Sequence, residues 1–154
     1  MFQTIVIGFD GSGQSHDALA LALKLADAGT ELIAVCVHPF QPVTVAVVPG
    51  ARGIGARAGA EAVLAEARRA ARPRALRCVA QPAASPAAGL LAVADEVTAD
   101  LVVLGPSHRG RIARHLPGDT ILRVTRDTAC PVAIAPLSFR SRAEAPGAAL
   151  GAAG

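Results

Sequence analysis

The sequence predicts one α/β domain in which a five-stranded parallel sheet lies between layers of helices. Five short apolar runs of strand length alternate with segments of helical composition. Strands joined by helical crossovers pair in parallel, so this alternation indicates a parallel sheet that is covered on both faces. A chain of 154 residues can bury a substantial core as one domain and requires no second one.

The N-terminal part predicts a strand, a helix and a second strand. The first strand is expected at Thr4–Phe9, a β-branched apolar run that ends in a turn rich in Asp, Gly and Ser. Ser15 is expected to cap a helix over His16–Ala28, and Gly29 ends this helix because glycine readily adopts the left-handed conformation found there. A buried strand follows at Glu31–Val37.

The middle of the chain predicts a loop, a helix and a third strand. Residues 40–55 contain closely spaced Pro and Gly and are expected to form a mobile loop. Helical composition with one apolar face returns over Ala56–Ala71 and stops before Pro73. The third strand is expected at Ala75–Ala80, and residues 81–84 are expected to form a loop.

The next helix is expected over Pro86–Val97, because Ser85 is a good N-cap and proline suits the first helical position. At the other end of the chain, residues 138–154 are small, rich in Gly and Ala and without periodicity. We therefore expect a domain over residues 1–137 followed by a disordered tail of little functional consequence.

The segment from Asp100 to Pro136 is the most informative part of the sequence. It predicts a strand at Leu101–Leu104, a Gly- and Arg-rich loop, a helix that opens at Gly118, and a strand at Pro131–Ala135. This order places free backbone N–H groups beside the carboxyl end of a strand, where parallel α/β sheets bind phosphate. Function is therefore expected to reside in this segment.

Composition excludes some classes of function. The net charge is +3 and nearly all the cations are arginine, which binds phosphate in a bidentate manner, but an arginine-rich proteome would produce the same excess. Trp and Tyr are absent and Phe occurs four times, which argues against base stacking and hence against a nucleic-acid partner.

The three cysteines are widely spaced within or beside apolar segments, so they are interpreted as core residues and not as metal ligands. The N-terminus does not read as a signal peptide, and no segment reaches membrane-spanning length. We therefore expect a reduced, cytoplasmic protein without a membrane partner.

No catalytic constellation is evident. The glycines in GFDGSG lack the spacing of a dinucleotide fingerprint, which argues against a nicotinamide enzyme. The spacing of His16, His38 and His115 indicates neither a triad nor a metal centre, and such histidines are commonly structural.

The chain resembles the universal stress protein family over essentially its whole length to Leu137. The matching segments are IVIGFDGSGQSHDALALAL, ELIAVCVHP, ADLVVLG, the loop that ends in Gly118, and ACPVAIAP, in the family's order and spacing. The resemblance implies a Rossmann-like sheet of order 3-2-1-4-5 and a homodimer formed through the edge strand Pro131–Pro136. It also implies a role in stress response.

Family members either bind ATP through a Gly-x2-Gly-x9-Gly-Ser/Thr signature or lack the signature and do not retain nucleotide. In this chain Gly105 matches the first glycine and Gly118 matches the third. His108 stands at the second glycine position and Asp119 at the Ser/Thr position, so two of the four positions depart from the signature.

Both departures are chemically tolerable for binding ATP, with or without Mg²⁺. Histidine enters the left-handed region at a cost of about 1 kcal/mol, and Gly110 can absorb part of the turn. A protonated His108 beside Arg109 adds attraction for a triphosphate. Asp119 opposes phosphate by charge, but Thr120 can supply the hydroxyl, or a divalent cation can bridge the carboxylate to phosphate.

The resemblance places two further residues at the adenosine end of the pocket. Asp10 matches the family's acidic residue there, and Val37 matches the apolar residue that contacts the adenine ring. A carboxylate at the carboxyl end of a strand can accept hydrogen bonds from a ribose or from the adenine amino group, although Asp also serves as an ordinary turn residue.

Three functions remain open at the level of the sequence. The first is a regulatory module that binds ATP. The second is a nucleotide-free dimeric scaffold, in which Gly118 and Asp119 only cap a helix and the loop at 40–55 contacts partners. The third is a slow ATP hydrolase or adenylate transferase, for which His108 and Asp119 are the only candidate general bases.

Overall fold

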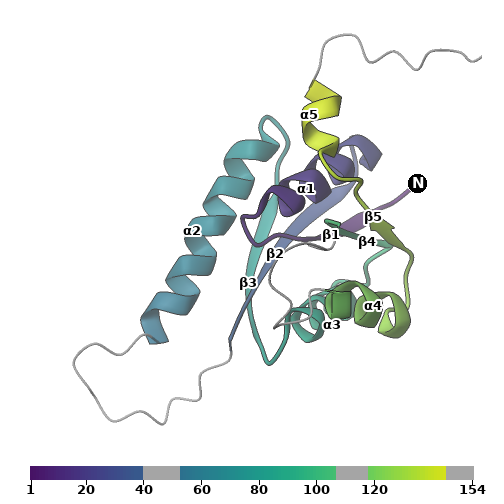
Figure 1. Cartoon of the computed structure of the whole chain (residues 1–154). Helices are drawn as coiled ribbons and strands as arrows, with labels where there is room; N and C mark the ends of the chain where they lie inside the picture. The colour runs from purple at the N-terminus through teal and green to yellow at the C-terminus, as the bar shows by residue number, and fades with distance from the viewer. Residues whose placement is uncertain (40–52, 107–117, 145–154) are drawn as a thin grey trace, which may run out of the picture.

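The computed structural model describes residues 1–39, 53–106 and 118–144, which form a parallel β-sheet and the helices around it (Figure 1). The five strands run in the order β3-β2-β1-β4-β5 and every neighbouring pair is parallel. This confirms the predicted fold class and strand order. The elements are β1 (Thr4–Gly8), α1 (Gly13–Leu25), β2 (Glu31–Pro39), α2 (Gly53–Ala71), β3 (Arg77–Ala83), α3 (Pro86–Glu96), β4 (Leu101–Leu104), α4 (Gly118–Asp127), β5 (Val132–Ile134) and α5 (Phe139–Glu144).

The helices form two layers that bury both faces of the sheet. One face of β1 and β2 packs with Leu19 of α1 and Leu64 of α2, and the opposite face packs with Val93 of α3 and Val124 of α4. The central strands are consequently apolar along their whole length, as β4 shows with four buried residues in a row. Figure 1 shows α1 and α2 on one side of the sheet and α3 and α4 on the other.

Helix α1 starts earlier than the sequence analysis expected. Its N-cap is Ser12, whose side chain accepts a hydrogen bond from the backbone N–H of Ser15. The hydroxyl of Ser15 donates to the carbonyl oxygen of Ser12, so Ser15 already lies within the first turn. The prediction of Ser15 as the cap is therefore wrong. Both serines are good N-caps, and the structure uses the one that directly follows Gly11.

Strand β3 continues to Ala83, although residues 81–84 were expected to form a loop. Pro82 is the reason for that expectation, since proline cannot donate to a β-ladder. The strand lies at an outer edge of the sheet, where one side of the backbone has no neighbouring strand among the described residues and a missing N–H is tolerated. The N-cap at Ser85, by contrast, is confirmed: its side chain accepts from the N–H of Ala88.

The segment after β5 differs from the expected disordered tail. Residues Phe139–Glu144 form the short helix α5, which packs against α1. The carboxylate of Asp17 in α1 accepts hydrogen bonds from the backbone N–H groups of Ser138 (2.9 Å) and Arg140 (2.8 Å), and this carboxylate ties the segment to the domain. The remainder of the expected tail, and residues 40–52 of the expected loop, lie outside the described residues.

Within the part of the chain that the structure describes, no helix is both long enough and apolar enough to cross a membrane.

Candidate functional site

The sheet changes winding direction between β1 and β4, and this point locates the candidate site. Helix α1, which follows β1, covers one face of the sheet, and α4, which follows β4, covers the other. The two connections therefore leave adjacent strands in opposite directions. In open parallel sheets the crevice opened in this way at the carboxyl ends of the strands is where ligands bind.

Asp10 lies directly beyond the carboxyl end of β1. The backbone ladder continues one residue past the strand, because the N–H of Phe9 donates to the carbonyl of Val35 in β2 at 2.9 Å. The pairing of Gly8 with Val35 then brings Asp10 level with Val37. The structure thus places the two residues that the resemblance assigns to the adenosine end near the carboxyl ends of adjacent strands.

The turn after β1 holds the Asp10 carboxylate in its charged form. Its Oδ1 accepts from the backbone N–H of Ser12 at 2.9 Å and from the Ser12 hydroxyl, and Gly11 permits the tight turn with a φ of +83°. Burial raises the pKa of Asp10, but the hydrogen bonds from Ser12 and Ser15 outweigh this effect and bring the pKa below its ordinary value. A charged acceptor therefore stands at the mouth of the sheet.

Gly105 follows β4 on the other side of the switch point and has no room for a side chain. A Cβ placed on this residue would lie 2.3 Å from the carbonyl oxygen of Gln14 in the first turn of α1. The β4 connection and the start of α1 thus touch through their backbones. This contact explains in physical terms why the position directly after β4 requires a glycine.

Val37 packs closely against α3. A Cβ on Gly89 of this helix would lie 2.6 Å from Cγ2 of Val37, so the glycine lets the helix approach the strand. The sequence analysis did not identify Gly89. A glycine within a helical segment was the available signal, since such a residue costs helix stability and needs a packing reason.

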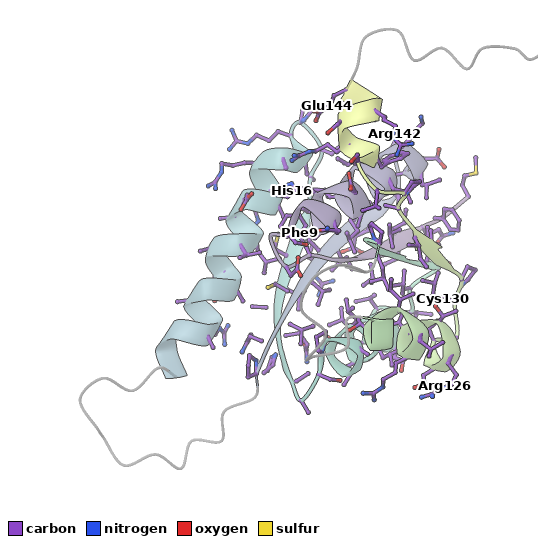
Figure 2. All side chains as sticks on the ribbon, viewed as in Figure 1. Phe9, His16, Arg126, Cys130, Arg142 and Glu144 are labelled. Atoms are coloured by element: carbon purple, nitrogen blue, oxygen red, sulfur yellow. The ribbon has the colours of Figure 1, made fainter. Side chains whose placement is uncertain are left out.

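The sequence analysis also did not predict the pairing of a buried histidine, His16, with a carboxylate. Nε2 of His16 in α1 lies 2.8 Å from Oε1 of Glu66 in α2, and the imidazole packs edge-on against the ring of Phe9 (Figure 2). His16 was interpreted as structural, and its contacts agree with that interpretation. The pair connects α1 to α2, and His16 contacts Phe9, the residue that precedes Asp10.

The phosphate end of the candidate site is described only in part. Helix α4 starts at Gly118, continues through Asp119, and contains the half-buried Thr120 in its first turn. Since β4 and β5 are parallel and α4 returns the chain between them, the N-terminus of α4 faces the carboxyl ends of the strands. His108, Arg109 and Gly110 lie outside the described residues, as does the side chain of Asp119.

The chemistry of the described part is that of recognition. It offers a carboxylate acceptor at Asp10, an apolar wall at Val37 and a backbone contact at Gly105 that admits no Cβ. Burial, and secondarily the charge of Asp10, raise the pKa of Cys36, which keeps this nearby thiol protonated and poorly nucleophilic. Among the residues that the structure describes, no group of three or more His, Cys, Asp or Glu could hold a metal ion.

The fold and the site together define a Rossmann-like α/β protein with its candidate site at the switch point of the sheet. Comparison with protein families gives a match to the universal stress protein family over residues 1–136. The chain therefore belongs to the universal stress protein family. No curated protein gives a significant match to the chain.

Solved structures with the same fold include several universal stress proteins. One, crystallised in complex with cAMP, is 29% identical, has a TM-score of 0.69, and the match covers 89% of this chain and 99% of that protein. A family member from Burkholderia pseudomallei is 26% identical, with a TM-score of 0.55 and coverages of 87% and 96%. A universal stress protein from Archaeoglobus fulgidus is 20% identical and has a TM-score of 0.67, and the match covers 88% of this chain and 100% of that protein. This similarity bears on the fold alone.

Proposed function

We propose that this protein is a cytoplasmic regulatory module of the stress response that binds an adenine nucleotide, ATP with Mg²⁺, at the carboxyl ends of β1 and β4. The observation that carries this proposal is the convergence of Asp10 and Gly105 on the switch point of the sheet. Family membership and the cAMP complex of a 29% identical relative support an adenine nucleotide as the class of ligand.

The described residues have the chemistry for the nucleoside half of such a ligand. The charged carboxylate of Asp10 can accept from ribose hydroxyls or from the adenine amino group, and Val37 on the next strand offers an apolar contact for the ring. The phosphates would lie toward Gly105 and the N-terminus of α4, where backbone N–H groups and the helix dipole favour anions. His108, Arg109, Gly110, Asp119 and Thr120 are proposed to complete this end.

The competing proposal is a nucleotide-free scaffold of the same fold. It is favoured by the departures at two signature positions, His108 and Asp119. In either case we propose a homodimer formed through residues 131–136. Strand β5 is an outer strand, and Ile134 on it is 46% exposed although it is a large apolar residue.

Calorimetric titration with ATP and Mg²⁺, and separately with cAMP, distinguishes the two proposals. For an adenine-nucleotide site we expect binding well below millimolar, weakened about tenfold by Asp10→Asn, because one charge-assisted hydrogen bond is reduced to a neutral one. The matched control is Glu96→Gln, which removes an exposed carboxylate at the far end of α3 and should leave the affinity unchanged.

A second variant tests the phosphate end. Gly118→Val puts a β-branched side chain at the start of α4 and should abolish whatever binding is measured, while circular dichroism checks that the fold is retained. If neither nucleotide binds more tightly than millimolar, the adenine-nucleotide proposal is refuted and the scaffold proposal stands.

A further inference from the structure

The outer edge of β3, on the opposite side of the sheet from β5, combines an unpaired backbone with a concentration of arginines. Among the described residues β3 pairs with β2 alone, so the backbone polar groups on its other side have no strand partner. Helix α2 packs on one face of this part of the sheet and α3 packs on the other. Neither helix takes the place of a neighbouring strand at the edge of β3. The edge spans the seven residues Arg77–Ala83.

The arginines gather around the start of this edge. Arg68, Arg69 and Arg72 stand exposed at the end of α2, and Arg74 and Arg77 follow in the turn and in the strand. Between Glu66 and Asp95 the sequence contains no acidic residue. The cluster is therefore a local excess of positive charge in a chain whose overall net charge is only +3.

The neighbouring acidic groups neutralise little of this excess. Glu31 lies 3.4 Å from Arg77, but both side chains are about half exposed, so the pair is weak. Arg74 is occupied in a structural role, since its guanidinium donates to the carbonyl oxygens of Asp27 and Thr30. Glu66 is already paired with His16, at 2.8 Å.

Arg68 links the cluster to the strand itself. Burial raises the pKa of the thiol of Cys78, the second residue of β3, and the positive charge of Arg68 acts on the same thiol and opposes this rise. Cationic groups thus approach the edge from the helix that covers one face, through Arg68, and from the strand, through Arg77. Beyond them the strand continues with the small or apolar residues Cys78, Val79 and Ala80, each partly buried.

We propose that the β3 edge is a docking site for an extended acidic peptide segment of a partner protein, which adds to the sheet as a sixth strand. The backbone edge supplies main-chain hydrogen bonds, and the arginines around its start select carboxylates in the adjoining half of the peptide. Successive side chains of an extended strand point to opposite faces, so its carboxylates can meet arginines from both α2 and β3.

Two other anionic partners fit this surface less well. A nucleic acid would use the arginines but not the backbone edge, and the sequence has no Trp or Tyr on which bases could stack. An anionic membrane would need large apolar side chains beside the cations. The exposed large apolar residues of the described chain are Met1, Leu122, Ile134 and Leu137, none of which belongs to β3 or to its arginine cluster.

The test uses the full-length protein and the fluorescein-labelled peptide DEDVTVT, with KRKVTVT as its charge-reversed counterpart. Fluorescence polarisation should show the acidic peptide binding at least about tenfold more tightly than the basic one. Hydrogen exchange in the complex should show protection of amides within residues 77–81 and 83, since Pro82 carries no N–H, and none at β5. A DEDPTVT peptide, which lacks one N–H, should bind more weakly if main-chain pairing contributes.

Charge reversal on the protein provides the matched comparison. The double variant Arg68→Glu with Arg72→Glu should weaken binding of DEDVTVT about tenfold or more, whereas Arg57→Glu near the other end of α2 should change it less than about twofold. The hydrogen-exchange experiment on the unmodified protein decides the matter even if the double variant is unstable. Absence of protection at 77–83, equal binding of the two peptides, or tighter binding of single-stranded DNA or phosphatidylserine vesicles would overturn the proposal.

Discussion

The β1–β4 strand pair has an aspartate at each of its two ends. The two residues have the same carboxylate chemistry but different structural roles. Asp10 follows β1 and accepts hydrogen bonds from Ser12, two residues away. Asp100 precedes β4 and accepts from the backbone N–H groups of Gln3 (2.7 Å) and Thr4 (2.9 Å), which are 97 and 96 residues away in the sequence. One carboxylate organises a turn, whereas the other joins two strands.

The comparison teaches that a lowered carboxyl pKa does not by itself mark a binding site. Hydrogen bonds from the backbone of Thr4 and Gln3 hold the pKa of Asp100 below its ordinary value, and the pKa of Asp10 is also lowered. The distinction comes from position and from the partners. Asp10 stands at the carboxyl ends of the strands, where a ligand can reach it. The hydrogen bonds that it accepts from Ser12 lie within the turn and do not join two strands.

The largest effect is expected at the carboxyl end, where the backbones of Gly105 and Gln14 touch. Gly105→Ala should lower the free energy of unfolding by about 3 kcal/mol, because the new Cβ meets a backbone oxygen that cannot move aside freely. It should also weaken nucleotide binding. Urea denaturation and titration calorimetry measure the two effects.

The matched control is Gly59→Ala in α2, where nothing lies within 4 Å of the added Cβ. This exposed helical position should gain about 0.5–1 kcal/mol of stability from the same substitution. Equal effects of the two substitutions would show that the close contact at Gly105 has no energetic weight.

Substitution of the two aspartates should have different effects when stability is measured as a function of pH and nucleotide affinity is measured beside it. Both pKa values are lowered in the folded protein, so each carboxylate contributes stability that is present above the ordinary pKa of Asp and is lost as the pH falls through the lowered pKa. Asp100→Asn should therefore reduce the urea midpoint at pH 7 and have little effect near pH 2. Nucleotide binding should remain intact in this variant.

Asp10→Asn, unlike Asp100→Asn, should clearly weaken nucleotide binding. Its effect on stability should depend on pH in the same direction as that of Asp100→Asn. Hydrogen exchange at Gln3 and Thr4 provides the local readout, because only Asp100→Asn should accelerate it. Faster exchange at these amides in Asp10→Asn would contradict the proposed division of roles.

The smallest effect is expected at the end of α3, near the amino end of β4. Thr98 has a φ of +51° and occupies the position after the helix that glycine usually takes, with the N–H of Ala99 bonded to the carbonyl of Ala94. Thr98→Gly should raise the free energy of unfolding by about 1 kcal/mol without changing nucleotide affinity. Thermal unfolding measures the gain, and a loss of stability would contradict it.

The strands and most helices could be predicted from the sequence because their apolar periodicity and terminal residues agree. The Ser85 cap and the all-buried β4 are examples in which local preference and tertiary packing favour the same structure. Two of the errors occurred where local signals favoured more than one structure. Two serines compete to cap α1, and Pro82 marks both a loop and an edge strand.

The candidate site was predictable only as far as its residues follow strands. Asp10, Val37 and Gly105 each stand at the carboxyl end of a strand, and parallel pairing brings such positions together. The contacts of Gly105 with Gln14 and of His16 with Glu66 depend on how helices lie against the sheet and against each other. Periodicity in a single sequence carries no information about that geometry.

The folded unit extends beyond the segment that the family shares. The family match ends at residue 136, whereas the carboxylate of Asp17, which is 6% exposed, accepts one hydrogen bond on each oxygen from the amides of residues 138 and 140. A protein that ends at residue 136 would keep all five strands, but the nearly buried carboxylate of Asp17 would lose its two hydrogen-bond donors. The safe place to end a shortened chain, or to attach a fusion partner, is therefore after Glu144.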